Sequence, residues 1–320
     1  MSSGLPSCKE ARRWRGLMSN VRTPWWLWPS LLSLDAPLVA LAWLYMFASA
    51  WQVNFLPWPS YAVLGLAVWM VYVVDRLLDG RLSMADDPLL GRQHEFHARH
   101  RNKFKLGLLV ALALELWLLV HEVTGAIFSP YGMLGFNYLT PGLGLVVVFF
   151  VLVVNSSGSR EIPFFRNFVA GAAFGYGTAM MAHIYVPSQE VFSLLVSREM
   201  IGFSVLCAVN ITAIHLWERS RLSVDPDEKA AMEGFLTILL TVVAASSVVF
   251  AYLDNPNLFS GGLDGGSYRA RPFFYAILIS CSLLLAINRS RRRFSLAALR
   301  TMADFAMIVP LPLFLILSRD

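Results

Sequence analysis

Two aspartates four residues apart, Asp75 and Asp79, close an apolar run over residues 60–79. Residues at i and i+4 share one face of a helix, so the two carboxylates would lie one turn apart. The C-terminal end of a helix carries partial negative charge, and two carboxylates there need a cation. Mg²⁺ fits, because it takes carboxylates together with phosphate oxygens. The alternative is a solvated acidic helix end, paired with Arg76 or Arg81.

A second polar stripe lies at the end of the run over residues 200–217. Asn210 and Glu218 are eight residues apart, so an amide oxygen and a carboxylate face the same way on a helix. Together they can complete a site for a hard cation such as Mg²⁺. Alternatively, Asn210 hydrogen-bonds a neighbouring helix and Glu218 pairs with Arg219 or Arg221.

The connection over residues 80–103 is hydrophilic and rich in arginine and histidine. Its residues of these types include Arg92, His94, His97, Arg99, His100 and Arg101. Because arginine grips phosphate through forked donors, the connection fits a lid over an anionic group. Attraction to anionic lipid head groups explains it equally well. Zinc between the first two histidines is the weakest interpretation, since no cysteine accompanies them.

The composition places these residues in a membrane. The chain has 320 residues, of which 57% are hydrophobic and 15% charged, against about 45–50% and 25% in soluble domains. Nine runs approach the roughly 20 apolar residues that a spanning helix needs. They are residues 36–56, 60–79, 104–123, 138–154, 163–184, 200–217, 233–252, 272–288 and 295–317. We expect an all-α polytopic membrane protein, a nine-transmembrane-helix bundle over residues 35–320, preceded by a basic, Trp-containing interfacial segment over residues 1–34.

The basic residues predict an orientation. With the N-terminus in the cytoplasm, 22 of the 26 Lys and Arg residues fall on the inner side and 4 on the outer side. This asymmetry follows the positive-inside rule. We therefore expect a cytoplasmic N-terminus and an external C-terminus, in a bacterial inner membrane. The net charge of +5 is then explained mostly by the basic residues that fix the orientation in the membrane, which argues against nucleic acid as a partner.

On this topology both acidic motifs end helices on the cytoplasmic side. Arg166 opens the run over residues 163–184 on that side, and Asp304 lies a few residues inside the run over 295–317. We expect acids from three helices and one arginine to enter a single cytoplasm-facing cavity. Glu115, near the middle of its run, is expected to hydrogen-bond a neighbouring helix rather than face the cavity.

Small residues in the apolar runs predict packing rather than chemistry. Gly171, Gly175 and Gly177 form a small-residue face of the kind that lets membrane helices approach closely. Cys207 and Cys281 lie within apolar runs, where cysteine behaves as a small core residue.

The order of these features resembles the UbiA superfamily of intramembrane prenyltransferases. The resemblance lies in nine spans, an aspartate motif closing the second, a basic loop after it and a polar motif closing the sixth. The family's first motif reads Asn-xxx-Asp-xxx-Asp; Asp75 and Asp79 match it, and Val71 takes the Asn position. The second motif of the family usually offers paired aspartates, where this chain has Asn210 and Glu218.

The resemblance implies transfer of a prenyl group from an isoprenyl diphosphate to an aromatic or other lipophilic acceptor within membrane lipid. It implies catalytic Mg²⁺ ligands at Asp75, Asp79, Asn210 and Glu218. It further implies diphosphate contacts from Arg166, Arg99, Arg101 and Arg92, with Asp304 as a supporting group. The Asn/Glu pair is also similar to part of the second metal motif of class I terpene synthases, so a terpene cyclase is the nearest alternative. A transporter or a non-catalytic membrane protein is the alternative of another class, although no internal repeat is evident.

Overall fold

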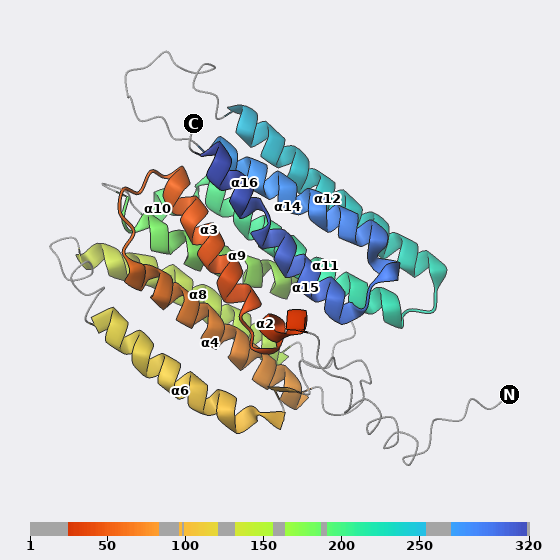
Figure 1. Ribbon diagram of the computed structural model, residues 1–320, viewed down its shortest axis with the longest axis horizontal. Coiled ribbons are helices and arrows are strands. Elements are labelled where there is room, and N and C mark those ends of the chain that lie inside the picture. The colour runs from red at the N-terminus through yellow and green to blue at the C-terminus, as the bar shows by residue number, and fades with distance from the viewer. Residues whose placement is uncertain are drawn as a thin grey trace.

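The computed structural model describes residues 25–82, 96–97, 99–120, 132–155, 164–186, 191–253 and 270–318. Of residues 79–82, 132–136 and 154–155 it describes the backbone alone. Within this part the chain is all-helical, and no strand occurs among these residues. The longer helices lie side by side as a bundle (Figure 1).

The helices follow one another along the chain, with short helical turns between some of them. They are η1 (Trp25–Leu27), α2 (Trp28–Leu31), α3 (Asp35–Ala50), α4 (Trp58–Leu82), α6 (Arg101–Leu118), α8 (Gly132–Asn155), α9 (Phe164–His183), α10 (Val191–Leu195), α11 (Arg198–Leu222), α12 (Pro226–Leu253), α14 (Arg271–Ser290), η3 (Arg291–Arg293), α15 (Leu296–Ile308) and α16 (Pro310–Leu317). Each of the nine predicted apolar runs coincides with one of these helices or, for the last run, with the pair α15 and α16.

The helices differ in their capacity to cross a membrane. Among the described residues, five spans are long and apolar enough by length and composition: the Trp58–Leu78 part of α4, α11, α12, α14 with η3, and α15 with α16. A pair bent by 82°, in which η1 and α2 form the first arm and α3 the second, would make a sixth. The count of nine spans is therefore not confirmed. The first predicted run is too long, because α3 ends at Ala50 and the chain then turns through Gln52, whose φ is 53°.

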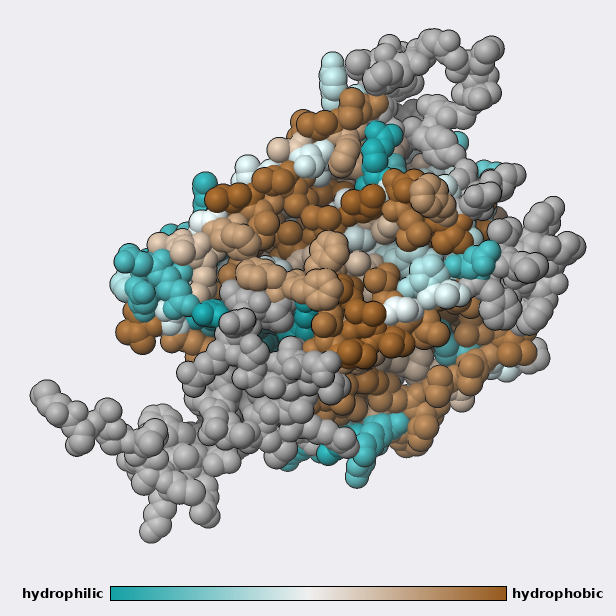
Figure 2. All heavy atoms as spheres, turned by 180° about the vertical axis from the view of Figure 1, so that it is seen from behind, coloured by the Kyte–Doolittle hydropathy of each residue, from teal (hydrophilic) through white to brown (hydrophobic). Residues whose placement is uncertain are grey.

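The outer surface of the bundle is apolar. Leu109 on α6 is 65% exposed and Ile238 on α12 is 63% exposed. Seen from behind, brown apolar side chains cover much of the described surface (Figure 2). Large apolar surfaces of this kind mark contact with a partner or a membrane. Together with the long apolar helices, they indicate a membrane-embedded protein.

Glycines bring α9 and α11 into close contact. A Cβ atom added at Gly175 would overlap Ser204 Oγ, and one at Gly171 would lie 2.5 Å from the backbone nitrogen of Ala208. The predicted packing face is thus confirmed for these two positions. Gly177 differs, because a Cβ there would meet no described atom within 4 Å.

Aromatic rings fill the core between α3, α11 and α14. Trp43 stacks on Phe203 with ring centroids 4.3 Å apart and meets Phe273 edge-on at 5.2 Å. Its indole nitrogen also donates a 2.8 Å hydrogen bond to the carbonyl of Met307. These contacts hold α15 beside α3.

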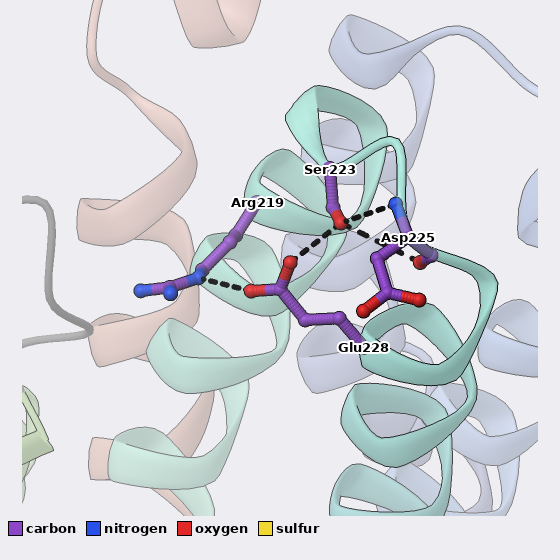
Figure 3. A network of polar contacts seen from close by, with 4 residues as sticks. All are labelled: Arg219, Ser223, Asp225 and Glu228. Atoms are coloured by element: carbon purple, nitrogen blue, oxygen red, sulfur yellow. Dashed lines mark hydrogen bonds and ion pairs between the residues drawn. The ribbon is translucent and has the colours of Figure 1, made fainter.

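A polar cap closes the corner between α11 and α12 (Figure 3). Ser223 Oγ donates to Glu228 Oε2 at 2.5 Å and accepts from the backbone nitrogen of Asp225 at 3.2 Å. Arg219 Nε lies 3.1 Å from Glu228 Oε1. Asp225 and Glu228, which follow α11, therefore stabilise the turn between the two helices, and these contacts fix the end of α11.

Candidate functional site

A cavity of about 500 Å³ lies inside the bundle. Side chains from α4, α6, α8, α9, α11 and α15 line it, together with Ser30 of α2. Because its walls come from helices far apart in the sequence, the residues that face it depend on how the helices pack.

Contacts between helices show which helix ends meet at each end of the cavity. Near the start of α9, Arg166 Nη2 lies 3.4 Å from His215 Nε2 on the last turns of α11. At the other end of α9, Tyr185 accepts a 2.9 Å hydrogen bond from Ser60, which lies at the start of α4. The beginning of α9 and the ends of α4 and α11 therefore gather at one end of the cavity.

That end collects most of the site residues predicted from the sequence. The predicted residues whose side chains line it are Asp75, Arg166, Asn210, Glu218 and Asp304. They come from α4, α9, α11 and α15. We refer to this region as the charged end.

The rest of the cavity is apolar. Its lining includes Val63 and Leu64 from α4, Met180 and Met181 from α9, and Ile184 directly after α9. The lining positions on α4 run from residue 63 to residue 76, which corresponds to roughly 20 Å along the axis of a helix. A long apolar chain can therefore lie along the helices while a polar group occupies the charged end.

Three residues at the charged end were not assigned to the site from the sequence. They are Arg76, His215 and Arg300. Arg76 lies next to the first aspartate motif and His215 lies inside the second polar stripe, so helical spacing could have found both. Arg300 lies four residues before Asp304, so the same spacing puts it on the face of that predicted residue; its pairing with Glu218 depends on the packing of α15 against α11.

Glu218 and Arg300 form an ion pair at the charged end. Arg300 donates from Nε and Nη2 to Glu218 Oε1 at 2.9 Å and 2.5 Å. The two side chains, Arg300 and Glu218, are 18% and 26% exposed. The structure thus pairs Glu218 with Arg300, whereas the sequence suggested Arg219 or Arg221.

Asp304 belongs to a second polar contact. Its carboxyl group shares hydrogen bonds with the side chains of Asp35 and Asn210. Asp35 is buried at the first turn of α3, and sequence reasoning missed it because it reads as an ordinary acid at the start of a helix. The group joins α3, α11 and α15 beside the cavity.

Several polar atoms on the cavity wall lack a partner within the described part of the chain. Among these residues, five buried side-chain nitrogen or oxygen atoms have no hydrogen bond. Three belong to cavity-lining residues: Asn210 Oδ1, His215 Nδ1 and Glu115 Oε2. Unsatisfied buried polar atoms are rare in proteins, and their concentration here indicates a polar ligand. Glu115 was expected to point away from the cavity, and this is wrong, because its side chain lines the cavity; its Oε2 has no partner among the described residues.

Other predicted residues lie elsewhere. Arg99 is exposed and Arg101 half-buried, and the described cavity lining contains neither. The backbone of Asp79 belongs to α4, but its side chain lies outside the described residues, as does Arg92 entirely.

The histidine pair considered for zinc is described in part. His94 lies outside the described residues. His97 is buried, lies 3.3 Å from Ser33 Oγ and stacks on Phe104 at 4.2 Å. This environment is that of a packed side chain.

The charged end offers a small set of ligands for Mg²⁺. Within the described part of the chain, no group of three or more His, Cys, Asp and Glu side chains is placed to hold a metal. Mg²⁺ bound with a phosphorylated substrate needs only one or two carboxylates from the protein. Asp75 and Asn210 Oδ1 fit this smaller requirement. The carboxylate of Glu218 is already engaged by Arg300.

Comparison of the chain with protein-family models, with curated proteins and with solved structures finds no match in any of the three. What the protein does is therefore inferred from the chemistry of its cavity and of its sequence motifs.

Proposed function

We propose that this protein is a Mg²⁺-dependent intramembrane prenyltransferase of the UbiA type. It ionises an isoprenyl diphosphate and transfers the prenyl group to a lipophilic acceptor. The observation that carries this proposal is a single cavity that is charged at one end and apolar along the rest. An isoprenyl diphosphate has the matching shape, since a polyanionic head is joined to a long apolar chain. The spacing of Asp75 and Asp79 supports the same family.

The charged end would bind the diphosphate. Arg76, Arg166 and Arg300 line it, and guanidinium groups bind phosphate oxygens through paired donors. Asp75 and Asn210 would hold Mg²⁺ between themselves and the head group. When bound, the metal supplies Lewis-acid stabilisation of the charge on the leaving diphosphate. In the orientation expected from the basic residues, the charged end would face the cytoplasm.

The apolar part would hold the prenyl chain and protect the cation. When the carbon–oxygen bond breaks, its electron pair leaves with the diphosphate and the allylic carbon becomes electrophilic. Apolar walls keep water away from this carbon. Phe149 and Phe174 also line the cavity, and aromatic faces attract cationic groups. An acceptor carbon then forms the new bond and releases a proton.

The test is release of diphosphate by the purified chain in lipid nanodiscs. Farnesyl and geranylgeranyl diphosphates are supplied with and without Mg²⁺. We expect release that requires Mg²⁺, and a fall of about a hundredfold in Asp75→Asn, comparable to removal of one essential electrostatic group from an active site. Asp227→Asn is the matched control, because Asp227 is an exposed acid beside the end of α11 and does not belong to the described cavity lining.

Each other result has a defined meaning. Equal activity in Asp75→Asn and the parent would remove Asp75 from the site. The proposal would be overturned if the protein released diphosphate from neither of the two donors. Mass spectrometry of products formed without an acceptor separates the two branches of the family, because a cyclic hydrocarbon would assign terpene cyclisation instead of transfer. Movement of an intact donor across vesicles would favour a transporter.

A further inference from the structure

Glu115 is a buried acid on the wall of the cavity. The residue is 7% exposed, and Oε2 has no hydrogen-bond partner within the described part of the chain. Burial of a polar group without a partner is costly, and the proposed chemistry at the charged end does not use this one. Its position therefore calls for a ligand group that can share a hydrogen bond.

Helix packing places Glu115 in the apolar part of the cavity. α6 runs antiparallel to α4 (Figure 1), and a Cβ added at Gly107 would lie 3.2 Å from the Trp69 ring. Glu115 follows Gly107 by eight residues, roughly 12 Å farther along α6 and away from Asp75. Leu119, the residue that follows the end of α6, belongs to the same wall.

We propose that Glu115 forms a second polar subsite, which binds a hydroxyl group at the apolar end of the cavity. The ligand set is then polar at both ends, with an anionic head at the charged end and a hydroxyl beside Glu115. This hydroxyl belongs either to the far end of the donor chain or to a second lipophilic molecule. The assignment of the anionic head rests on the proposed function, whereas the hydroxyl subsite rests on Glu115 alone.

Equilibrium binding in nanodiscs with Mg²⁺ tests the subsite. The probes are dodecyl diphosphate and 12-hydroxydodecyl diphosphate, whose saturated chains cannot form an allylic cation. We expect the hydroxylated probe to bind the parent about tenfold more tightly, consistent with one hydrogen bond to an acid. Glu115→Leu should lose this preference, and Glu115→Gln should keep part of it. Leu119→Ala is the matched control, because it should weaken both probes equally and leave their ratio unchanged.

A pair of probes without a head group separates the two proposals. Thermal unfolding is measured with 1-dodecanol and with dodecane, because a ligand that binds the folded state raises the melting temperature. A larger thermal shift with dodecanol than with dodecane, lost in Glu115→Leu, supports the hydroxyl subsite. This holds even if neither diphosphate binds. Failure of both diphosphates to bind would overturn the proposed function and leave the hydroxyl subsite standing. Dodecanol that binds together with dodecyl diphosphate identifies a second molecule as the source of the hydroxyl; mutual exclusion identifies the donor chain.

The subsite would be overturned if Glu115→Leu preferred 12-hydroxydodecyl diphosphate over dodecyl diphosphate as strongly as the parent does. The same thermal shift with dodecanol and dodecane in the parent would also overturn it.

Discussion

Arg300 binds the carboxylate of Glu218 across a sequence separation of 82 residues, with 2.9 Å between Nε and Oε1. The pair joins α15 to α11 at the charged end of the cavity. It has two consequences for the site. The guanidinium group of Arg300 is held at the position where a diphosphate would bind, and the carboxylate of Glu218 is occupied by a cation that belongs to the protein.

Loss of either partner of this ion pair should destabilise the protein. Glu218→Gln and Arg300→Met should each lower the free energy of unfolding by about 1–3 kcal/mol, between the values typical of exposed and fully buried pairs. Because each change leaves the other charge without its partner, the double variant should lose less than the sum of the single variants. Unfolding in detergent with a chemical denaturant measures all four proteins. Additive losses would show that the two side chains do not interact in the folded protein.

Arg166 should be specific for the head group of the ligand. Its side chain lines the charged end and lies beside His215. Arg166→Gln should weaken binding of dodecyl diphosphate about tenfold or more, since a charge-assisted contact is lost, and should leave binding of 1-dodecanol unchanged. Arg219→Gln is the matched control, because Arg219 pairs with Glu228 outside the described lining. A similar loss in both variants would indicate a general effect of positive charge.

Asn210 should set the requirement for Mg²⁺. Its Oδ1 lies on the cavity wall with no partner among the described residues, so Asn210→Ala removes a ligand and Asn210→Asp replaces it with a charged one. In titrations of diphosphate release against Mg²⁺, we expect the alanine variant to need about tenfold more metal and the aspartate variant to need no more than the parent. Circular dichroism checks that both variants fold, since Asn210 also contacts Asp304. An unchanged Mg²⁺ requirement in the alanine variant would exclude Asn210 as a ligand.

Gly175 and Gly177 should respond in different ways to alanine. The added methyl group of Gly175→Ala would overlap Ser204, so α9 and α11 must separate and the protein should lose about 1–3 kcal/mol of stability. Gly177→Ala adds the same group in open space beside the cavity, and it should unfold at a slightly higher temperature than the parent, because alanine favours the interior of a helix over glycine by about 1 kcal/mol. Thermal unfolding followed by tryptophan fluorescence compares them. Equal melting temperatures would show that close packing at Gly175 is not required.

Much of the charged end could be predicted from the sequence. Helical spacing predicted that Asp75 shares a helix face with Asp79 and that Asn210 shares one with Glu218. The distribution of basic residues suggested that these helix ends meet one membrane side together with Arg166. One cavity is lined by Asp75, Arg166, Asn210 and Glu218. These predictions depend on the periodicity of a helix and on the energetic cost of placing charge in lipid. Both can be derived from the sequence without the tertiary structure.

The linear order of residues was enough to specify an apolar, helical, membrane-embedded chain in which a few costly polar residues recur at helical spacing. Which of those residues are partners emerged from the packing of the helices. Packing paired Arg300 with Glu218, brought Asp35 to Asp304 and left Glu115 Oε2 without a partner among the described residues. A helix specifies the direction of its side chains relative to its own axis. The rotation and depth of one helix against another instead follow from contacts between distant segments, such as the approach of Gly175 to Ser204.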